Sequence, residues 1–140
     1  MNSVIKISDA ANLGIHAMAH LATSDPNCAH AVVEIASELG VSEAHLAKVM
    51  QRLVRAGLVA SRRGPGGGFV LGRPAALITM LEIYEAIDGP LGAGGCLLGH
   101  ERCLYGDCLF GDLVPRMNRE VRELLSKRNL STLSKEKRRS

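Results

Sequence analysis

Two amphipathic segments that meet at a glycine constrain the fold more than any other feature of the sequence. The first, about residues 33–39, ends before Gly40, which suits the left-handed backbone of a helix C-terminus. The second, about residues 43–56, starts after Ser42, a good N-cap residue, and has Glu43 in its first turn. A short helix, a glycine turn and a longer helix predict a helix-turn-helix motif.

The second of these helices has one apolar face and one basic face. The apolar positions, at helical spacing, are Leu46, Val49, Met50 and Leu53. The opposite face carries His45, Lys48, Arg52 and Arg55. From residue 42 to residue 73 the chain has six basic side chains and one acidic one, a local charge of +5, whereas the whole chain has a net charge of only +3. This concentration suits a nucleic-acid partner, although a solvated helix face would carry the same charge.

A glycine-rich hairpin, "LVASRRGPGGGFVLGR", follows the second helix directly. We expect strands at residues 58–62 and 69–72, with glycines at the tip that let the backbone approach another surface. A β-hairpin after a recognition helix makes the motif a winged helix. The "GPGGG" stretch does not predict a nucleotide site, because it lacks the lysine and the following helix of a phosphate-binding loop.

Three further helices are expected around this motif. A first helix covers about residues 8–24, and Thr79 with Glu82 forms a capping box for a helix at about 80–88. A last helix covers residues 112–127. Its apolar stripe consists of Leu113, Met117, Val121, Leu124 and Leu125. The stripe packs either on a second copy of the chain or on its own domain, and we favour a homodimer because DNA readers usually pair half-sites.

The sequence therefore predicts a mainly α fold with a small β-wing: a winged helix-turn-helix and a long C-terminal dimerisation helix. We divide the chain into a DNA-binding domain (1–90), a cysteine loop (91–111), the dimerisation helix (112–128) and a basic tail (129–140). No apolar run has membrane-spanning length and the start lacks a secretory signal, so we expect a cytoplasmic protein with no membrane partner. Thiols stay reduced in the cytoplasm, where clustered cysteines more often bind metal or react than form structural disulfides.

Three of the four cysteines, Cys96, Cys103 and Cys108, lie within thirteen residues of glycine-rich sequence. Their spacing differs from that of a structural zinc site, which normally has four ligands in closer pairs. Zinc with His100 or Asp107 as fourth ligand and a disulfide switch both remain open. An iron–sulfur cluster is a further possibility, because thiolates are its usual ligands. We expect no enzyme, since no cysteine and histidine form a recognisable nucleophile and base.

The order of these motifs resembles the IscR/NsrR-type family of bacterial iron–sulfur winged-helix regulators. The resemblance rests on "RRGPGGGFVLGRP", "ITMLEIYEAIDGPL" and the cysteine triplet, and it covers about residues 5–133. It implies that the triplet ligates an iron–sulfur cluster of the 2Fe–2S or 4Fe–4S type. The middle cysteine is displaced by one residue from the family's more even spacing, which leaves the type of cluster open.

The resemblance also bears on the fourth ligand. It implies either a histidine three residues after the last cysteine, where this chain has Gly111, or a residue on the partner's first helix, at positions matching Asn12 and His16. We predict that His16 ligates from the partner subunit, because neutral imidazole is a better iron ligand than an amide. The alternatives are Asp9, His100, Asp107, an external small ligand, and no fourth ligand at all. We interpret Cys28, alone in a loop, as an ordinary thiol.

We therefore expect a transcriptional regulator that binds double-stranded promoter DNA as a homodimer, with binding modulated by an iron–sulfur cluster. The signal would be iron, redox state, oxidants or nitric oxide. The alternative is a zinc- or disulfide-based winged-helix regulator or adaptor without a cluster. The predicted DNA contacts are Ser42, Glu43, Ala44, His45, Lys48, Arg52, Arg62, Arg63, Gly66 and Gly67.

Overall fold

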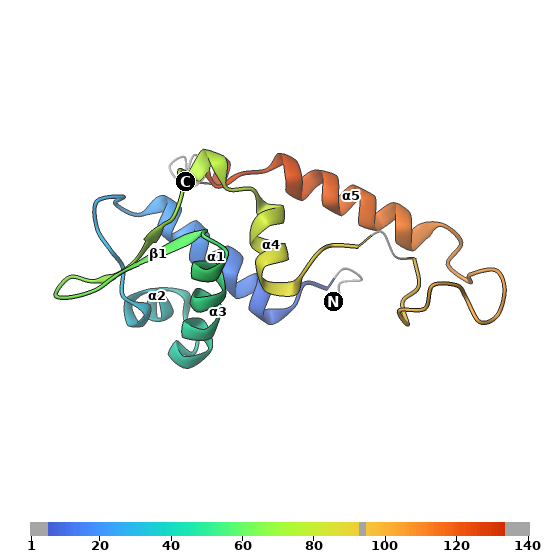
Figure 1. Ribbon diagram of the computed structural model, residues 1–140, viewed down its shortest axis with the longest axis horizontal. Coiled ribbons are helices and arrows are strands. Elements are labelled where there is room, and N and C mark those ends of the chain that lie inside the picture. The colour runs from blue at the N-terminus through green and yellow to red at the C-terminus, as the bar shows by residue number, and fades with distance from the viewer. Residues whose placement is uncertain (1–5, 93–94, 134–140) are drawn as a thin grey trace.

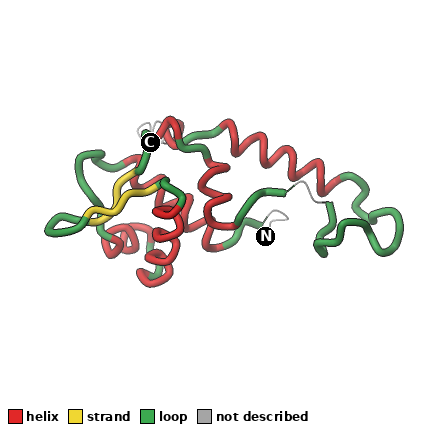
Figure 2. Tube along the Cα trace, viewed as in Figure 1, coloured by secondary structure: helices red, strands yellow, loops and turns green. Residues whose placement is uncertain are grey.

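The computed structural model describes residues 6–92 and 95–133. Its elements in chain order are α1 (Asp9–Thr23), α2 (Val32–Leu39), α3 (Glu43–Arg55), β1 (Val59–Arg62), β2 (Gly68–Leu71), the 3-10 turn η1 (Ala75–Leu77), α4 (Met80–Asp88) and α5 (Leu113–Lys127). The helix-turn-helix and the strands lie at one end of an elongated molecule, and α5 runs back toward them from the cysteine loop at the other end (Figures 1 and 2). The fold is mainly α with a small β-wing, as predicted.

Capping residues set the helix boundaries at the positions that the sequence predicts. Gly40 ends α2 with a φ of +67°. Ser42 begins α3, and its Oγ accepts the N–H of His45 at 3.3 Å. The capping box of Thr79 and Glu82 is present at the start of α4. These local hydrogen bonds satisfy backbone groups that a helix end leaves without partners.

The wing is an antiparallel hairpin that pairs residues 59–62 with residues 68–71, within one residue of the predicted bounds. The loop before α2 joins this hairpin, because His30 and Phe69 exchange two backbone hydrogen bonds of 2.9 and 2.8 Å. Gly68 permits the approach, since a Cβ at this position would collide with the His30 carbonyl group. The base of the wing is thereby attached to the segment between α1 and α2.

The core is aliphatic and lies mainly between α1, α3 and α4. The entire predicted apolar face of α3 is buried, and each such side chain contributes about 1.5–3 kcal/mol. α1 crosses the other two helices closely at Gly14, where a Cβ would lie 3.3 Å from Cγ1 of Ile87 and 3.4 Å from Cγ1 of Val49. The last turn of α4 therefore lies against both α1 and the recognition helix α3.

The chain returns to this core after α5, which corrects the predicted tail. Leu130 is fully buried, and its N–H donates to the carbonyl oxygen of Ile78 at 3.1 Å. Residues 129–133 thus pack on the body of the protein, although the sequence analysis assigned all of residues 129–140 to a basic tail. The pattern missed this segment because it is too short to show a period. Residues 134–140 lie outside the described residues.

Candidate nucleic-acid interface and cysteine loop

The first turns of α3 present the predicted DNA-reading side chains to solvent. Five of these residues are exposed: Ser42, Glu43, Ala44, His45 and Lys48. The opposite side of α3 is held in the core, so the orientation of the exposed face is fixed. The N-terminal part of α3 is therefore free to enter a DNA groove.

Arg52, further along α3, has a partner within the protein. Its Nη1 donates to the carbonyl oxygen of Ile87, in the last turn of α4, at 3.2 Å. Carbonyl groups at a helix C-terminus lack intrahelical donors and carry partial negative charge, so a guanidinium is a suitable partner. Helix periodicity alone places Arg52 among the predicted DNA contacts, because periodicity cannot show a contact with a distant helix.

The wing has two exposed arginines and a glycine-rich tip. Arg62 and Arg63 are exposed, as is Gly66 at the tip. The N–H of Gly67 donates to the carbonyl oxygen of Gly64 at 2.9 Å, which closes the tip as a tight turn. The tip therefore has cationic side chains beside a backbone without bulky groups.

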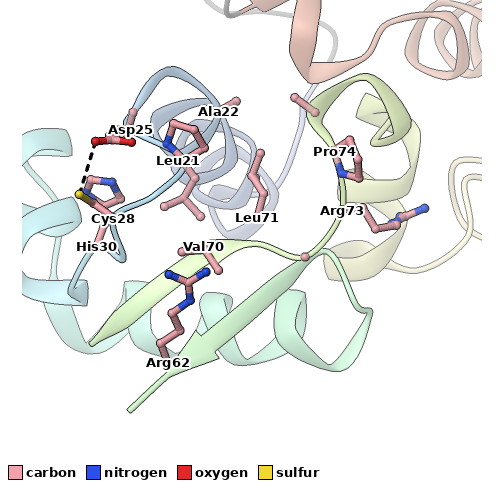
Figure 3. A pocket seen from close by; sticks show the side chains of 14 residues that line it. Leu21, Ala22, Asp25, Cys28, His30, Arg62, Val70, Leu71, Arg73 and Pro74 are labelled. Atoms are coloured by element: carbon pink, nitrogen blue, oxygen red, sulfur yellow. Dashed lines mark hydrogen bonds between the residues drawn. The ribbon is translucent and has the colours of Figure 1, made fainter. Parts of the chain in front are cut away.

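A hollow of about 480 Å³ lies between the loop after α1 and strand β2 (Figure 3). The Cys28 thiol lies at one side of it and donates to a carboxylate oxygen of Asp25 at 3.5 Å. This hydrogen bond and the charge of Asp25 raise the pKa of the Cys28 thiol. Arg73, labelled in Figure 3, pairs with Glu82 of α4 at 2.9 Å. None of the triplet cysteines lines this hollow.

The three other cysteines each open the same local turn. The sequences are Cys-Leu-Leu-Gly at 96–99, Cys-Leu-Tyr-Gly at 103–106 and Cys-Leu-Phe-Gly at 108–111. In each turn the glycine N–H donates to the carbonyl oxygen of its cysteine, at 3.0, 3.4 and 2.9 Å. The glycines have φ values of +81°, +89° and +59°, a conformation that strains any other residue. Three Cys-Leu-X-Gly turns therefore build the loop.

These turns account for Gly111, which stands where the resemblance suggested a histidine ligand. Gly111 closes the third turn in the left-handed region, so a histidine there would disfavour the turn. The sequence analysis recorded the thiols but missed the glycines that position them. The repeated Cys-Leu-X-Gly pattern was the signal that could have identified Gly99, Gly106 and Gly111 together.

The turns surround a hollow of about 620 Å³ that all three triplet cysteines line, together with Asp107. The loop closes at its neck, where a Cβ at Gly95 would lie 3.3 Å from Cδ of Pro115. Within residues 6–92 and 95–133, no three His, Cys, Asp or Glu side chains are grouped closely enough to hold a metal ion. Thiolates are suitable ligands for an iron–sulfur cluster, but the three turns must move closer together before their thiols can bind one.

Apolar side chains surround the thiols. The two residues after each cysteine are exposed: Leu97, Leu98, Leu104, Tyr105, Leu109 and Phe110. Leu97 and Phe110 also line a second hollow, of about 410 Å³, with the half-buried α5 residues Met117, Val121 and Leu125. Exposed apolar surface of this kind marks a place for another molecule.

Backbone donors surround the first thiol of the loop. The N–H groups of His100, Leu98 and Gly99 lower the pKa of Cys96. They do so because they stabilise its thiolate, which is the form that binds metal and attacks electrophiles. The first turn therefore favours the thiolate form of Cys96.

His16, the predicted fourth ligand, lies on α1 in an exposed position. Its Nδ1 is 2.7 Å from the carbonyl oxygen of Asn12, which leaves Nε2 for another partner. It lines a hollow of about 300 Å³ with Asp9, Asn12 and His45, and this hollow shares no residue with the cysteine hollow. Within one chain the structure thus brings Asp107, rather than His16, beside the triplet.

An exposed recognition helix followed by a basic, glycine-tipped wing defines a winged-helix DNA-binding protein. The family model for Rrf2, described as an iron-dependent transcriptional regulator, matches residues 7–136. The chain therefore belongs to the Rrf2 family, as the resemblance suggested, and it is a transcriptional regulator rather than an enzyme.

Individual relatives support this assignment. The transcriptional regulator IscR of Yersinia enterocolitica is 30% identical over 130 residues, which cover 92% of this chain and 79% of that protein. The structure of CymR, the global cysteine regulator of B. subtilis, is similar with a TM-score of 0.79 and 30% identity, over 94% of this chain and 98% of that chain. The structure of the oxidized form of Staphylococcus aureus CymR is similar with a TM-score of 0.74 and 27% identity, over 93% of this chain and 96% of that chain. No helix of the described residues is long and apolar enough to cross a membrane.

Proposed function

We propose that this regulator binds promoter DNA as a homodimer and that an iron–sulfur cluster, held by Cys96, Cys103 and Cys108, modulates the binding. The observation that carries the proposal is the repeated Cys-Leu-X-Gly turn. Three identical turns line one hollow with three thiols, and one of these thiols has backbone donors at its sulfur. A loop that only connected two helices would not need three turns that each begin with a cysteine and end with a glycine in the left-handed region.

The DNA-contacting surface combines the two exposed elements already described. His45 and Lys48 would reach base edges from the start of α3, while Arg62, Arg63 and the wing backbone would contact phosphates or the minor groove. Phosphate contacts position the protein and base contacts specify the sequence. Arg52 is exposed and uses one guanidinium nitrogen to donate to α4, so we propose it as a contact within the protein and not as a primary DNA contact.

The cysteine loop would hold the cluster through the three thiolates and a fourth ligand. A bound cluster would supply iron–thiolate bonds that join the three turns and that oxidants, nitric oxide or iron shortage can break. The N–H groups around Cys96 would stabilise its thiolate for this role. For the fourth position we retain His16 of the partner subunit, and Asp107, which lines the hollow within the chain, is the main alternative.

The homodimer would form along α5 and the loop. Met117, Val121 and Leu125 are only half-buried against the rest of the chain, and the leucines and aromatic side chains of the turns are exposed. A second copy would cover this apolar surface and set the distance between two reading heads.

A disulfide switch without a cluster is the competing function. It gains weight from the similarity to the oxidized form of a CymR protein and from the free thiols in the loop.

Affinity for DNA tests the proposal and separates it from the disulfide switch. The protein is purified without oxygen, and a duplex selected from a random library is titrated with the cluster-loaded and the cluster-free, reduced forms. We expect the two affinities to differ by a factor on the order of 5–150, a typical size for coupling between two sites. Equal affinities, together with a change only on thiol oxidation, would favour the disulfide switch.

A further inference from the structure

The last turn of α4 lies between the recognition helix and the two segments that flank the cysteine turns. Three segments make polar contacts there: the recognition helix α3, the linker around Leu91 at the start of the cysteine loop, and the helix α5 that follows the loop. The start of α1 adds a further contact, because Oγ of Ser8 donates to a carboxylate oxygen of Asp88 at 2.6 Å. Figure 1 shows α4 between the winged-helix body and α5.

Glu85 and Arg122 form the side of this junction that faces the loop. One carboxylate oxygen of Glu85 accepts the N–H of Leu91 at 2.9 Å and lies 3.6 Å from Nη1 of Arg122. The same Nη1 donates to the carbonyl oxygen of Leu91 at 3.0 Å. Both backbone groups of Leu91 are thus held between α4 and α5, four residues before the described part of the cysteine loop resumes at Gly95.

Ile87 and Arg52 form the side that faces DNA. Ile87 packs where α1 and α3 cross, close to Gly14 and Val49, and its carbonyl oxygen accepts Arg52 of the recognition helix. Glu85 lies two residues earlier in the same helical turn. A shift of the linker or of α5 at Glu85 would therefore be carried by one rigid turn to the recognition helix.

We infer that Glu85 and Arg122 are positioning residues that couple the state of the cysteine loop to the orientation of α3, and that Arg52 transmits this coupling rather than contacting DNA. The inference rests on the proposed function, because it describes how a change in the cysteine loop would reach the DNA-binding surface. A change in how the three thiols are held would let the loop rearrange, and the Glu85–Leu91–Arg122 contacts would transfer a movement of the linker or of α5 to α4. Coupling of this kind requires that the contacts differ in free energy between the two states of the loop.

The test compares DNA affinity of the cluster-loaded and cluster-free protein for Arg122→Ala and for a matched control. The control is Arg116→Ala, on the same helix, whose Nη1 pairs at 3.4 Å with Asp112 of its own helix cap. The cluster is reconstituted with ferrous iron and sulfide, and the probe is a duplex selected by the wild-type protein. We expect the affinity ratio to collapse to within about twofold of one in Arg122→Ala and to stay at the wild-type value in Arg116→Ala, with cluster absorption unchanged in both.

Glu85→Gln provides a second variant, because its amide oxygen can still accept the Leu91 N–H while the charge facing Arg122 is lost. We expect it to reduce the ratio as well. A wild-type ratio in both Arg122→Ala and Glu85→Gln would overturn the inference, and so would an equal loss in Arg116→Ala. A wild-type protein whose two forms bind DNA equally would instead refute the proposed function itself.

Arg52→Ala separates transmission from DNA contact. A phosphate contact should reduce the slope of log affinity against log salt by about one and weaken both forms equally. We expect an unchanged slope and a reduced ratio. If the salt dependence became weaker while the affinity ratio of the two forms stayed at the wild-type value, Arg52 would be a DNA contact and not part of the coupling.

Discussion

At the scale of single residues, Cys28 and Cys96 differ in the groups that surround their sulfur atoms. Cys28 donates to a carboxylate, whereas Cys96 receives N–H groups, so the pKa of the first thiol is raised and that of the second is lowered. Sequence reasoning separated Cys28 from the triplet by spacing alone. Spacing could not show these pKa shifts, because they depend on the carboxylate of Asp25 beside one sulfur and on the backbone N–H groups beside the other.

The pKa difference predicts unequal reactivity in the metal-free protein. At neutral pH, iodoacetamide should alkylate Cys96 faster than the more exposed Cys28, as measured by peptide mass spectrometry over time. Below both pKa values each thiolate fraction falls tenfold per pH unit, so the rate ratio stays constant there and shrinks as the pH rises above the lowered pKa of Cys96. In urea the two rates should converge. A faster reaction at Cys28 in the folded protein would contradict the assignment.

The glycine of the middle turn should help to position the thiol of its cysteine. Gly106→Ala places a Cβ in the left-handed region, which costs about 1–2 kcal/mol, and should therefore loosen the turn and make the cluster bleach faster in air. Leu104→Ala, in the same turn and exposed, leaves the backbone unstrained and should bleach at the wild-type rate. Identical bleaching rates for the two variants would show that the turn does not position the thiol.

At the scale of elements, the sequence predicted helices and strands within about one residue, because several helix ends have local capping signals. The N-cap of α3 and the capping box of α4 are chemical signals that need no tertiary contact. Contacts between distant segments could not be predicted in this way. Leu130 is buried only when the segment after α5 packs beside Ile78. The hydrogen bond from Arg52 to Ile87 forms only when α3 and α4 pack together.

The wing and the end of the recognition helix offer an element-scale comparison. Arg63→Ala should weaken DNA binding more than Arg55→Ala, because Arg63 leads into the wing tip and Arg55 lies in the last turn of α3. Loss of a phosphate contact should weaken all sequences about equally, whereas loss of a base contact should cost about 1–3 kcal/mol and relax preference at one position. Fluorescence anisotropy checks both variants, and unchanged affinity in both would remove the wing from the interface.

At the scale of the whole molecule, a two-fold dimer would present two winged helices to one duplex. If about eight phosphates are contacted per dimer, log affinity should fall with log salt with a slope of roughly −7. Footprinting on the selected duplex should show protection with approximate two-fold symmetry, since operator symmetry follows protein symmetry. A slope near zero, or protection of a single half-site at all concentrations, would contradict the dimeric interface.

The central claim is that the Cys-Leu-X-Gly turns hold an iron–sulfur cluster, and the visible absorption of anaerobically purified protein tests it most directly. Iron and acid-labile sulfide are counted on the same samples of the wild type, Cys28→Ala and each of Cys96→Ala, Cys103→Ala and Cys108→Ala. We predict a coloured wild type and Cys28→Ala that contain iron and sulfide, and three colourless triplet variants, because each lacks one thiolate bond to iron. A colourless wild type that contains zinc or no metal would contradict the account.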